Sequence, residues 1–182
     1  MKKKLQHLVS AAALALFVFI AFGSMDDDGD SSSSSSSGTV SADNTATAKL
    51  LGETLSTKYF DVTVNEVSLQ DRVSTGNQFA DLKKEAGNQY LILNTTFKNT
   101  DGESRMISDG EVIINYNGKD YLFDKSETVM LEGWGTMLDQ LNPLTSKTTN
   151  LVYKIPTEIK GPAYYRPGRS SKSDLIAIGN IE

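Results

Sequence analysis

The chain of 182 residues contains no cysteine, and its only histidine is His7. The lack of cysteine excludes disulfide bonds, catalysis by a thiol, thiolate metal sites and attachment of a lipid to a cysteine. The lack of histidine after residue 7 removes the imidazole on which general-base catalysis and zinc or copper sites commonly depend. A domain built from the later residues must therefore be held together by its apolar core alone.

The chain also lacks an excess of positive charge. It has 18 Lys and Arg against 23 Asp and Glu, which gives a formal net charge of −5. Residues 50–182 remain acidic, with fourteen basic and eighteen acidic side chains. Proteins that bind nucleic acid present a basic face to the phosphates. We therefore expect no nucleic-acid partner.

Sequence motifs of catalysis are missing as well. There is no Gly-x-Ser-x-Gly, no Ser-x-x-Lys pair, no phosphate-binding loop and no dinucleotide fingerprint. Carboxylate pairs such as Asp101/Glu103 and Asp120/Asp124 are typical of any acidic surface. We expect no catalytic residues, no cofactor and no metal site. The alternative is a carboxylate-dependent enzyme acting on cell-wall glycan, which needs two carboxyl groups about 5–10 Å apart in a cleft.

The N-terminus has the pattern of an export signal. Lys2, Lys3 and Lys4 precede an apolar run from Leu8 to Phe22. This order predicts that residues 1–23 form a signal peptide or a signal-anchor helix. We favour an uncleaved helix that anchors the protein in the cell membrane and leaves the rest outside the cytoplasm. The alternative is cleavage after Gly23, since Ala21 and Gly23 have the spacing of a signal-peptidase site, followed by secretion.

Residues 24–54 predict a disordered linker, because they contain almost no large apolar side chain. Aspartates 26–28 and 30 are followed by seven serines, residues 31–37. The aspartates do not form a calcium-binding loop, since an EF-hand counted from Asp26 would place Ser37 where a glutamate is required. We interpret this segment as a solvated spacer between the membrane and a folded domain.

Residues 55–182 predict an all-β domain. Phe60, Val62 and Val64 alternate with polar residues, and a slip of one residue before Val67 indicates a β-bulge. Further strands are predicted over residues 90–98, 112–116, 121–123, 151–155, 163–166 and 175–178. Asn117-Gly118 predicts a tight turn of a hairpin. Residues 79–86 could form one or two helical turns, and residues 126–138 remain ambiguous.

About seven strands favour a β-sandwich. The residues expected to share its core are Phe60, Val62, Val64, Leu91, Leu93, Phe97, Val112, Ile114, Leu151, Tyr153 and Ile155.

Two strand patterns resemble a known family. The run Tyr90-Leu-Ile-Leu-Asn-Thr-Thr-Phe-Lys-Asn99 resembles the core strand of a telokin-like, immunoglobulin-fold family of unknown function, found in Gram-positive lipoproteins and membrane-tethered surface proteins. The run Leu141-Asn-Pro-Leu-Thr-Ser-Lys-Thr-Thr-Asn-Leu-Val-Tyr-Lys-Ile-Pro156 resembles its loop and following strand. The resemblance implies an immunoglobulin-like sandwich and no particular chemistry. Many members carry a lipidated cysteine after the leader, whereas Ser24 stands near that place here.

Five residues are candidates for binding. Trp134, the only tryptophan, lies between two glycines, either as an exposed ring ready to contact a partner or as a plug at one end of the sandwich. A second group combines aromatic area with positive charge near the C-terminus: Tyr164, Tyr165, Arg166 and Arg169. This combination suits an anionic wall polymer, a headgroup or an acidic protein face. The alternative is one core tyrosine, one surface tyrosine and a solvated basic loop. We expect a non-enzymatic module at the bacterial cell surface. Besides the enzyme acting on wall glycan, the alternative is an envelope protein that blocks uptake or senses stress. Its expected contacts are the membrane, through its N-terminus, and an unknown envelope protein or wall polymer.

Overall fold

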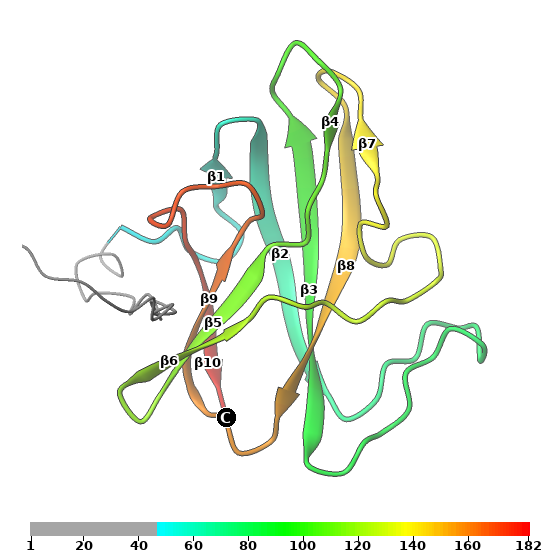
Figure 1. The fold of residues 1–182 in the computed structure, drawn as a ribbon, viewed down its shortest axis with the longest axis vertical. Coiled ribbons are helices and arrows are strands. Elements are labelled where there is room, and N and C mark those ends of the chain that lie inside the picture. Colours follow the sequence, from blue (N-terminus) through cyan, green and yellow to red (C-terminus); the bar gives the residue numbers. More distant parts are fainter. Residues whose placement is uncertain (1–46) are drawn as a thin grey trace, which may run out of the picture. The chain divides into compact units, whose positions relative to one another are not determined.

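A computed structural model describes residues 47–182, which form the domain drawn in colour in Figure 1. The predicted leader, residues 1–23, and the predicted linker up to residue 46 lie outside the described residues. No helix within residues 47–182 is long and apolar enough to cross a membrane. The regular elements of this part of the chain are all strands, which confirms the predicted all-β class.

The strands form three antiparallel sheets. The first sheet has the order β1-β2-β3-β8, the second has the order β10-β9-β5-β6, and β4 pairs with β7 alone. The bounds are β1 Thr54–Ser56, β2 Phe60–Gln70, β3 Asn88–Asn99, β4 Arg105–Met106, β5 Glu111–Tyr116, β6 Lys119–Phe123, β7 Gln140–Leu141, β8 Ser146–Pro156, β9 Gly161–Arg166 and β10 Ile176–Ile181. Seven of these were predicted. The other three, β1, β4 and β7, are two or three residues long, which is too short for alternation to reveal them.

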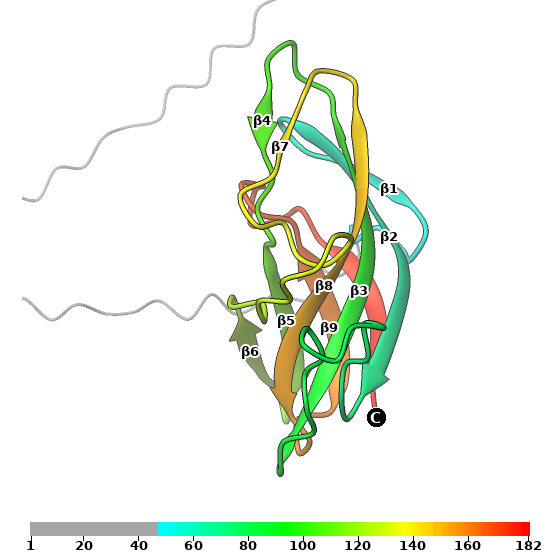
Figure 2. The same cartoon turned by 90° about the vertical axis from the view of Figure 1, so that its right-hand side faces the viewer.

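The two larger sheets face each other across one apolar core, so the predicted β-sandwich is confirmed. Figure 2 shows β2 and β3 on one side of this core and β5 and β6 on the other. All eleven residues expected to share the core belong to this one cluster. Phe97 and Phe60 meet edge to face there, with ring centroids 6.4 Å apart. Strand alternation therefore placed the correct face of each strand inward.

Two local predictions are also confirmed. The pairing of β2 with β3 shifts register between Val64 and Glu66, where the bulge was expected. Asn117 and Gly118 both have positive φ, 52° and 76°, in the turn that joins β5 to β6. Asparagine and glycine tolerate this left-handed backbone better than other residues, so this turn is fixed by its sequence.

The segment 79–86 is not helical. A single turn forms where the backbone nitrogen of Ala80 donates to Asn77, and Leu82 then pairs with Val73 in an antiparallel bridge. The side chain of Asp81 accepts hydrogen bonds from the backbone and hydroxyl of Thr75. These contacts draw the chain back toward β2, which prevents a second helical turn.

The folded part of the chain includes residues placed in the predicted linker. The backbone nitrogen of Lys49 donates to Leu175 at 2.9 Å, and its carbonyl accepts from Ala177 at 2.7 Å. Lys49 thereby forms a parallel bridge to β10. The boundary at residue 54 falls on the first residue of β1. The chain thus enters the domain along the free edge of the second sheet.

Candidate functional site

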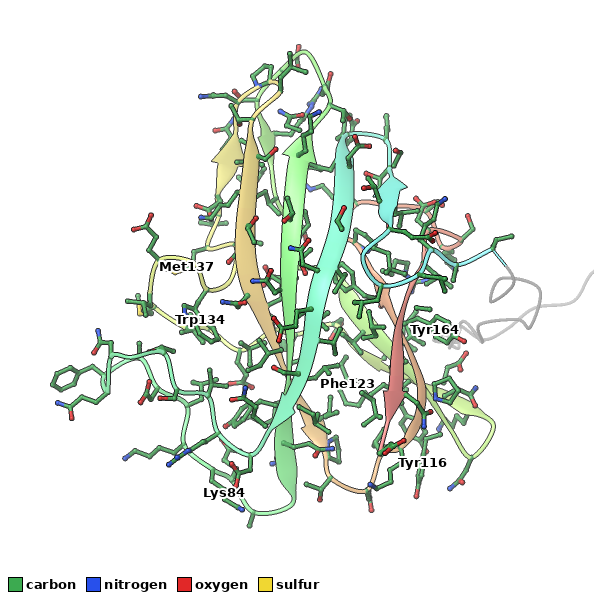
Figure 3. The ribbon with its side chains drawn as sticks, turned by 180° about the vertical axis from the view of Figure 1, so that it is seen from behind. Lys84, Tyr116, Phe123, Trp134, Met137 and Tyr164 are labelled. Carbon is green, nitrogen blue, oxygen red and sulfur yellow. The ribbon has the colours of Figure 1, made fainter. Side chains whose placement is uncertain are left out.

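The outer face of the first sheet carries a second apolar cluster, separate from the core between the sheets. Its buried members are Val73, Tyr90, Ile92, Val129 and Val152. Three of them stand on β3 and β8, and the other two come from a first loop, residues 71–87, and a second loop, residues 124–139. Both loops extend from the same side of the domain in Figures 1 and 3. The loops thus shield apolar side chains that the sheet would otherwise expose to water.

The first loop is a small hairpin. Val73 and Leu82 exchange two backbone hydrogen bonds of 2.9 and 3.0 Å, and the side chain of Asn77 accepts from the backbone nitrogen of Phe79. These bonds shape the tip of the loop and leave the Phe79 ring 90% exposed. A large aromatic ring so completely in water has no role in the apolar packing described above.

The second loop is attached to the edge of β8. The backbone nitrogen of Asn150 donates to Gly133 and its carbonyl accepts from Gly135, both at 2.8 Å. The loop therefore occupies the hydrogen-bonding edge that β8 would otherwise offer to another strand. Beyond this attachment Met137 and Leu138 both have positive φ, 34° and 64°. Such a backbone is unfavourable for residues other than glycine, asparagine and aspartate, and is held here by the surrounding loop.

Three side chains of the second loop point their apolar surface at water. Met130 is 73%, Met137 53% and Leu138 79% exposed. We call these three the loop surface. A hollow of about 460 Å³ lies beside it, lined by Met130, Met137 and Trp134 and bordered by the ion pair of Asp139 with Lys147. Flexible methionine side chains adapt well to a partner, and apolar groups gathered on one loop are typical of interaction sites.

Lys154 on β8 ties the two loops to the sheet. Its ammonium group lies 3.0 Å from the carboxylate of Glu85 in the first loop and 3.3 Å from that of Glu127 in the second. The hydrogen bond that Lys154 donates to Glu85 raises the pKa of Lys154, and the same bond lowers the pKa of Glu85. Both groups stay charged near neutral pH, so this link holds the loops in place across the physiological range.

Trp134 lies at the border between this apolar region and a polar part of the sheet. The ring is half-buried and packs against the second apolar cluster. It lines the hollow beside Met130 and also a smaller groove over β2 and β3. In Figure 3 Trp134 lies beside β8. The ring therefore covers a face of the sandwich rather than closing one of its ends.

The other four predicted binding residues do not form one surface. Tyr165 is fully buried in the core, whereas Tyr164 is half-buried on the opposite face of β9. Arg166 forms an ion pair with Glu111, and Arg169 stands exposed on the following loop. Tyr164 lies on the side of the domain away from Trp134 in Figure 3. Strand alternation therefore turns Tyr165 into the core and leaves Tyr164 and Arg166 on the outer face of β9.

The carboxyl groups with shifted pKa values are all held in the charged form. A hydrogen bond from Lys84 lowers the pKa of Asp71, and one from Arg105 lowers that of Asp101. A general acid needs a raised pKa instead. Within residues 47–182 no three acidic or histidine side chains come together in a way that could hold a metal ion. The expectations of no catalysis and no metal stay predictions.

Sequence analysis missed the exposed residues Phe79, Met130, Met137 and Leu138. The alternation of apolar residues reports which face of a strand is buried, and loops have no such period. One signal was present: Met130-Leu131 and Met137-Leu138 are apolar pairs within the segment whose structure the sequence left ambiguous, a short strand followed by an excursion around Trp134. Apolar side chains in a loop that belongs to no regular element are candidates for contact with a partner.

Comparison with known families gives one match over most of this domain. A family model described as "Domain of unknown function (DUF4352)" matches residues 49–166. No curated protein matches the chain.

Three solved bacterial structures are similar to this chain, and two of them reach a TM-score of 0.51. An uncharacterized beta-sandwich protein from Clostridium difficile 630 aligns over 71% of this chain and 91% of its own, at 14% identity and a TM-score of 0.51. A conserved hypothetical protein from Bacillus anthracis aligns over 74% of this chain and 95% of its own, at 22% identity and a TM-score of 0.51. A Bacillus subtilis protein provisionally described as a lipoprotein, ycdA, aligns over 71% and 38%, at 15% identity and a TM-score of 0.45.

Proposed function

The chain belongs to the DUF4352 family of domains of unknown function, and from this membership and the geometry of the two loops we propose that the domain is a non-enzymatic interaction module that binds an envelope protein outside the cytoplasm. The observation that carries the proposal is the loop surface, Met130, Met137 and Leu138. These side chains are more than half exposed although the loop itself is folded and attached to β8. Burying them against a partner would remove apolar area from water.

The charges around the loop surface favour a protein over a lipid bilayer. Glu132 and Asp139 flank it together with Lys147, so both signs are present. A surface that meets anionic lipids carries an excess of lysine and arginine. The whole region from residue 50 onward is acidic, which also disfavours an anionic bilayer or an anionic wall polymer. A protein face with apolar and mixed polar groups matches this surface better.

The location follows from the N-terminal sequence. Lys2–Lys4 followed by the apolar run 8–22 would anchor the chain in the cell membrane, with cleavage after Gly23 and secretion as the alternative. We assign the sandwich to the telokin-like, immunoglobulin-fold domains of Gram-positive surface proteins, on the strand patterns at residues 90–99 and 141–156. Membrane fractionation of the full chain separates anchoring from secretion.

Three observations support a non-enzymatic role. The domain has no cysteine and no histidine, and the resolved pKa shifts of Asp71, Glu85 and Asp101 are all downward. The hollow beside the loop surface is lined by four large apolar side chains, and Lys147 pairs with one of its two acidic groups. Catalytic acids commonly have raised pKa values in a polar cleft. A surface suited to burial is the more fitting use of this arrangement.

The test is cross-linking in intact envelopes of cells that carry the full chain. Met130→Ser together with Leu138→Ser should remove the cross-linked partner protein, because the two changes replace the apolar contact area. Leu144→Ser is the matched control, since Leu144 is 74% exposed on another loop, between β7 and β8. The control should retain the partner in full.

A partner retained by the double variant at the level of the control would show that the loop surface is not the contact. The melting temperature of each variant is measured in parallel. All three replaced residues are exposed, so we expect these temperatures to change little.

A further inference from the structure

The outer face of the first sheet contains a polar groove beside the second loop. Ile92 and Asn94 on β3 form its floor, and residues Glu66, Ser68 and Gln70 of β2 line it on one side. Trp134 and Asn150 line it on the other side, and its volume is about 170 Å³. Figure 3 looks onto this face of the sheet, with Trp134 beside β8.

The β-bulge in β2 creates this groove. Val64 pairs with Thr95 and Glu66 pairs with Asn94, so the additional residue Asn65 stands between them. The side chain of Asn65 donates to Asn94 and Thr96 on the outer face, both at 2.9 Å. Without this additional residue, alternation from Val64 would turn Val67 and Leu69 to the outer face. The bulge instead places Glu66, Ser68 and Gln70 there, and these three line the groove.

An uncharged hydrogen-bond network orients the amide groups of the groove. Asn94 donates to the side chain of Asn150 at 2.9 Å, and Asn150 donates to the carbonyl of Gly133 at 3.3 Å. Thr96 and Thr148 continue the network with a bond of 2.8 Å between their hydroxyl groups. An amide side chain has two N–H donors and an oxygen with two lone pairs. The bonds to Asn94 and Asn150 use half of this capacity, and both residues line the groove.

Trp134 supplies an aromatic surface next to these amides. The backbone bonds of Gly133 and Gly135 to Asn150 fix the position of the residue between them. The ring packs on the second apolar cluster and also lines the groove, so it is held in place before any ligand arrives. Such preorganisation lowers the entropy lost on binding.

This combination selects a class of ligand. The lining has no lysine or arginine, and its single charged group is the carboxylate of Glu66, which disfavours phosphates and other anions. A pyranose ring has an apolar C–H face that stacks on an indole, and hydroxyl groups that both donate to carboxylate and amide oxygens and accept from amide N–H groups. We propose that this groove binds a neutral glycan, with one sugar ring against Trp134. The hydroxyl groups of the glycan would bond the polar side chains that line the groove, Asn94, Asn150, Glu66 and Gln70.

The glycan site goes beyond the proposed binding of a protein and does not depend on it. The loop surface lies outside the groove, and Trp134 is the one residue next to both. A domain with both sites would hold its protein partner close to wall polysaccharide.

The sole tryptophan of the chain gives a direct test. The full chain is kept in a detergent without a sugar head group and titrated with chitotetraose and with cellotetraose at millimolar concentrations, while the emission of Trp134 is recorded. We expect a saturable change with at least one of these neutral oligosaccharides. Asn94→Ala and Gln70→Ala should each weaken binding about three- to tenfold, the effect of losing one hydrogen bond.

Thr63→Ala is the matched control, because Thr63 is on the outer face of β2 but bonds Thr54, outside the groove. It should leave the affinity unchanged. Trp134→Phe, followed by calorimetry, should retain binding at reduced affinity because a ring remains for stacking.

No emission change with either oligosaccharide would overturn the proposal. So would equal affinities for the parent, the Asn94 variant and the Gln70 variant, or tighter binding of polyglycerol phosphate than of both oligosaccharides. Met130→Ser should leave glycan binding intact, so loss of the protein partner and loss of the glycan are separate results.

Discussion

The hydroxyl groups of Tyr153 and Tyr165 both donate a hydrogen bond of 2.7 Å to one acceptor, the backbone carbonyl of Asp109. Tyr153 stands on β8 of the first sheet and Tyr165 on β9 of the second, and both are fully buried. The carbonyl thus uses both lone pairs, one toward each sheet. This contact joins the two layers through a loop that precedes β5.

The first prediction concerns the coupling of these two tyrosines. Tyr153→Phe or Tyr165→Phe should each lower the free energy of unfolding by about 1 kcal/mol, because the carbonyl keeps its other donor. The double variant leaves the partly buried carbonyl of Asp109 without a donor, so its loss should exceed the sum by about 1–2 kcal/mol. Urea unfolding of the four proteins measures this cycle. Simple additivity would mean that water replaces the missing donors.

The second prediction is a loss of stability at alkaline pH. Burial raises the pKa of both tyrosines well above the usual value of 10.0. Below pH 10 the folded and unfolded states both keep these protons, and the stabilisation is complete. Above it the unfolded chain loses them while the folded chain retains them, so stability falls as pH rises. Urea midpoints on either side of pH 10 measure the decline. The stability of the double phenylalanine variant should fall less steeply with pH than that of the parent. An equal slope in both proteins would show that Tyr153 and Tyr165 do not cause the decline.

Much of the fold could be predicted because its signals are local. Phe60, Val62 and Val64 alternate along one strand, and Asn117-Gly118 determines its own turn. The second apolar cluster was missed although Tyr90 and Ile92 interrupt the alternation, giving β3 a continuous apolar stretch. Such a stretch indicates a strand covered on both faces.

The candidate site depends on contacts between residues far apart in the sequence. Arg166 was expected to bind a partner, but it pairs with Glu111, which lies on the neighbouring strand. The groove needs a bulge in β2, amides from β3 and β8, and Trp134 from a loop. Each residue type was visible in the sequence, whereas their meeting on one face follows from the order of the strands.

The third prediction tests where the folded domain begins. A chain that starts at Thr47 keeps both backbone hydrogen bonds of Lys49 to the segment 175–177, whereas one that starts at Gly52 loses them. We expect the shorter chain to be less stable by about 1–3 kcal/mol, given about 0.5–1.5 kcal/mol for each bond. Thermal and urea unfolding of the two chains measure the difference. Equal stability would place Lys49 outside the cooperative unit.

The last prediction separates backbone strain from steric overlap at two glycines. Gly110 and Gly76 have similar φ angles, 77° and 85°. A Cβ on Gly110 would lie 2.3 Å from the carbonyl oxygen of Arg166, whereas a Cβ on Gly76 would meet nothing within 4 Å.

Gly76→Ala should therefore cost only the left-handed backbone term, about 1–2 kcal/mol. Gly110→Ala should cost that amount and about 1–3 kcal/mol more, because β9 has to move away from the turn that holds Asp109. Urea unfolding of both variants measures the difference.

The overlap also predicts a local effect, since a displaced Asp109 carbonyl weakens its bonds to Tyr153 and Tyr165. In the Gly110 variant the phenylalanine changes at these tyrosines should then cost less than in the parent, whereas in the Gly76 variant their cost should be unchanged. Equal costs in all three backgrounds would show that the strand absorbs the added methyl group without moving the turn.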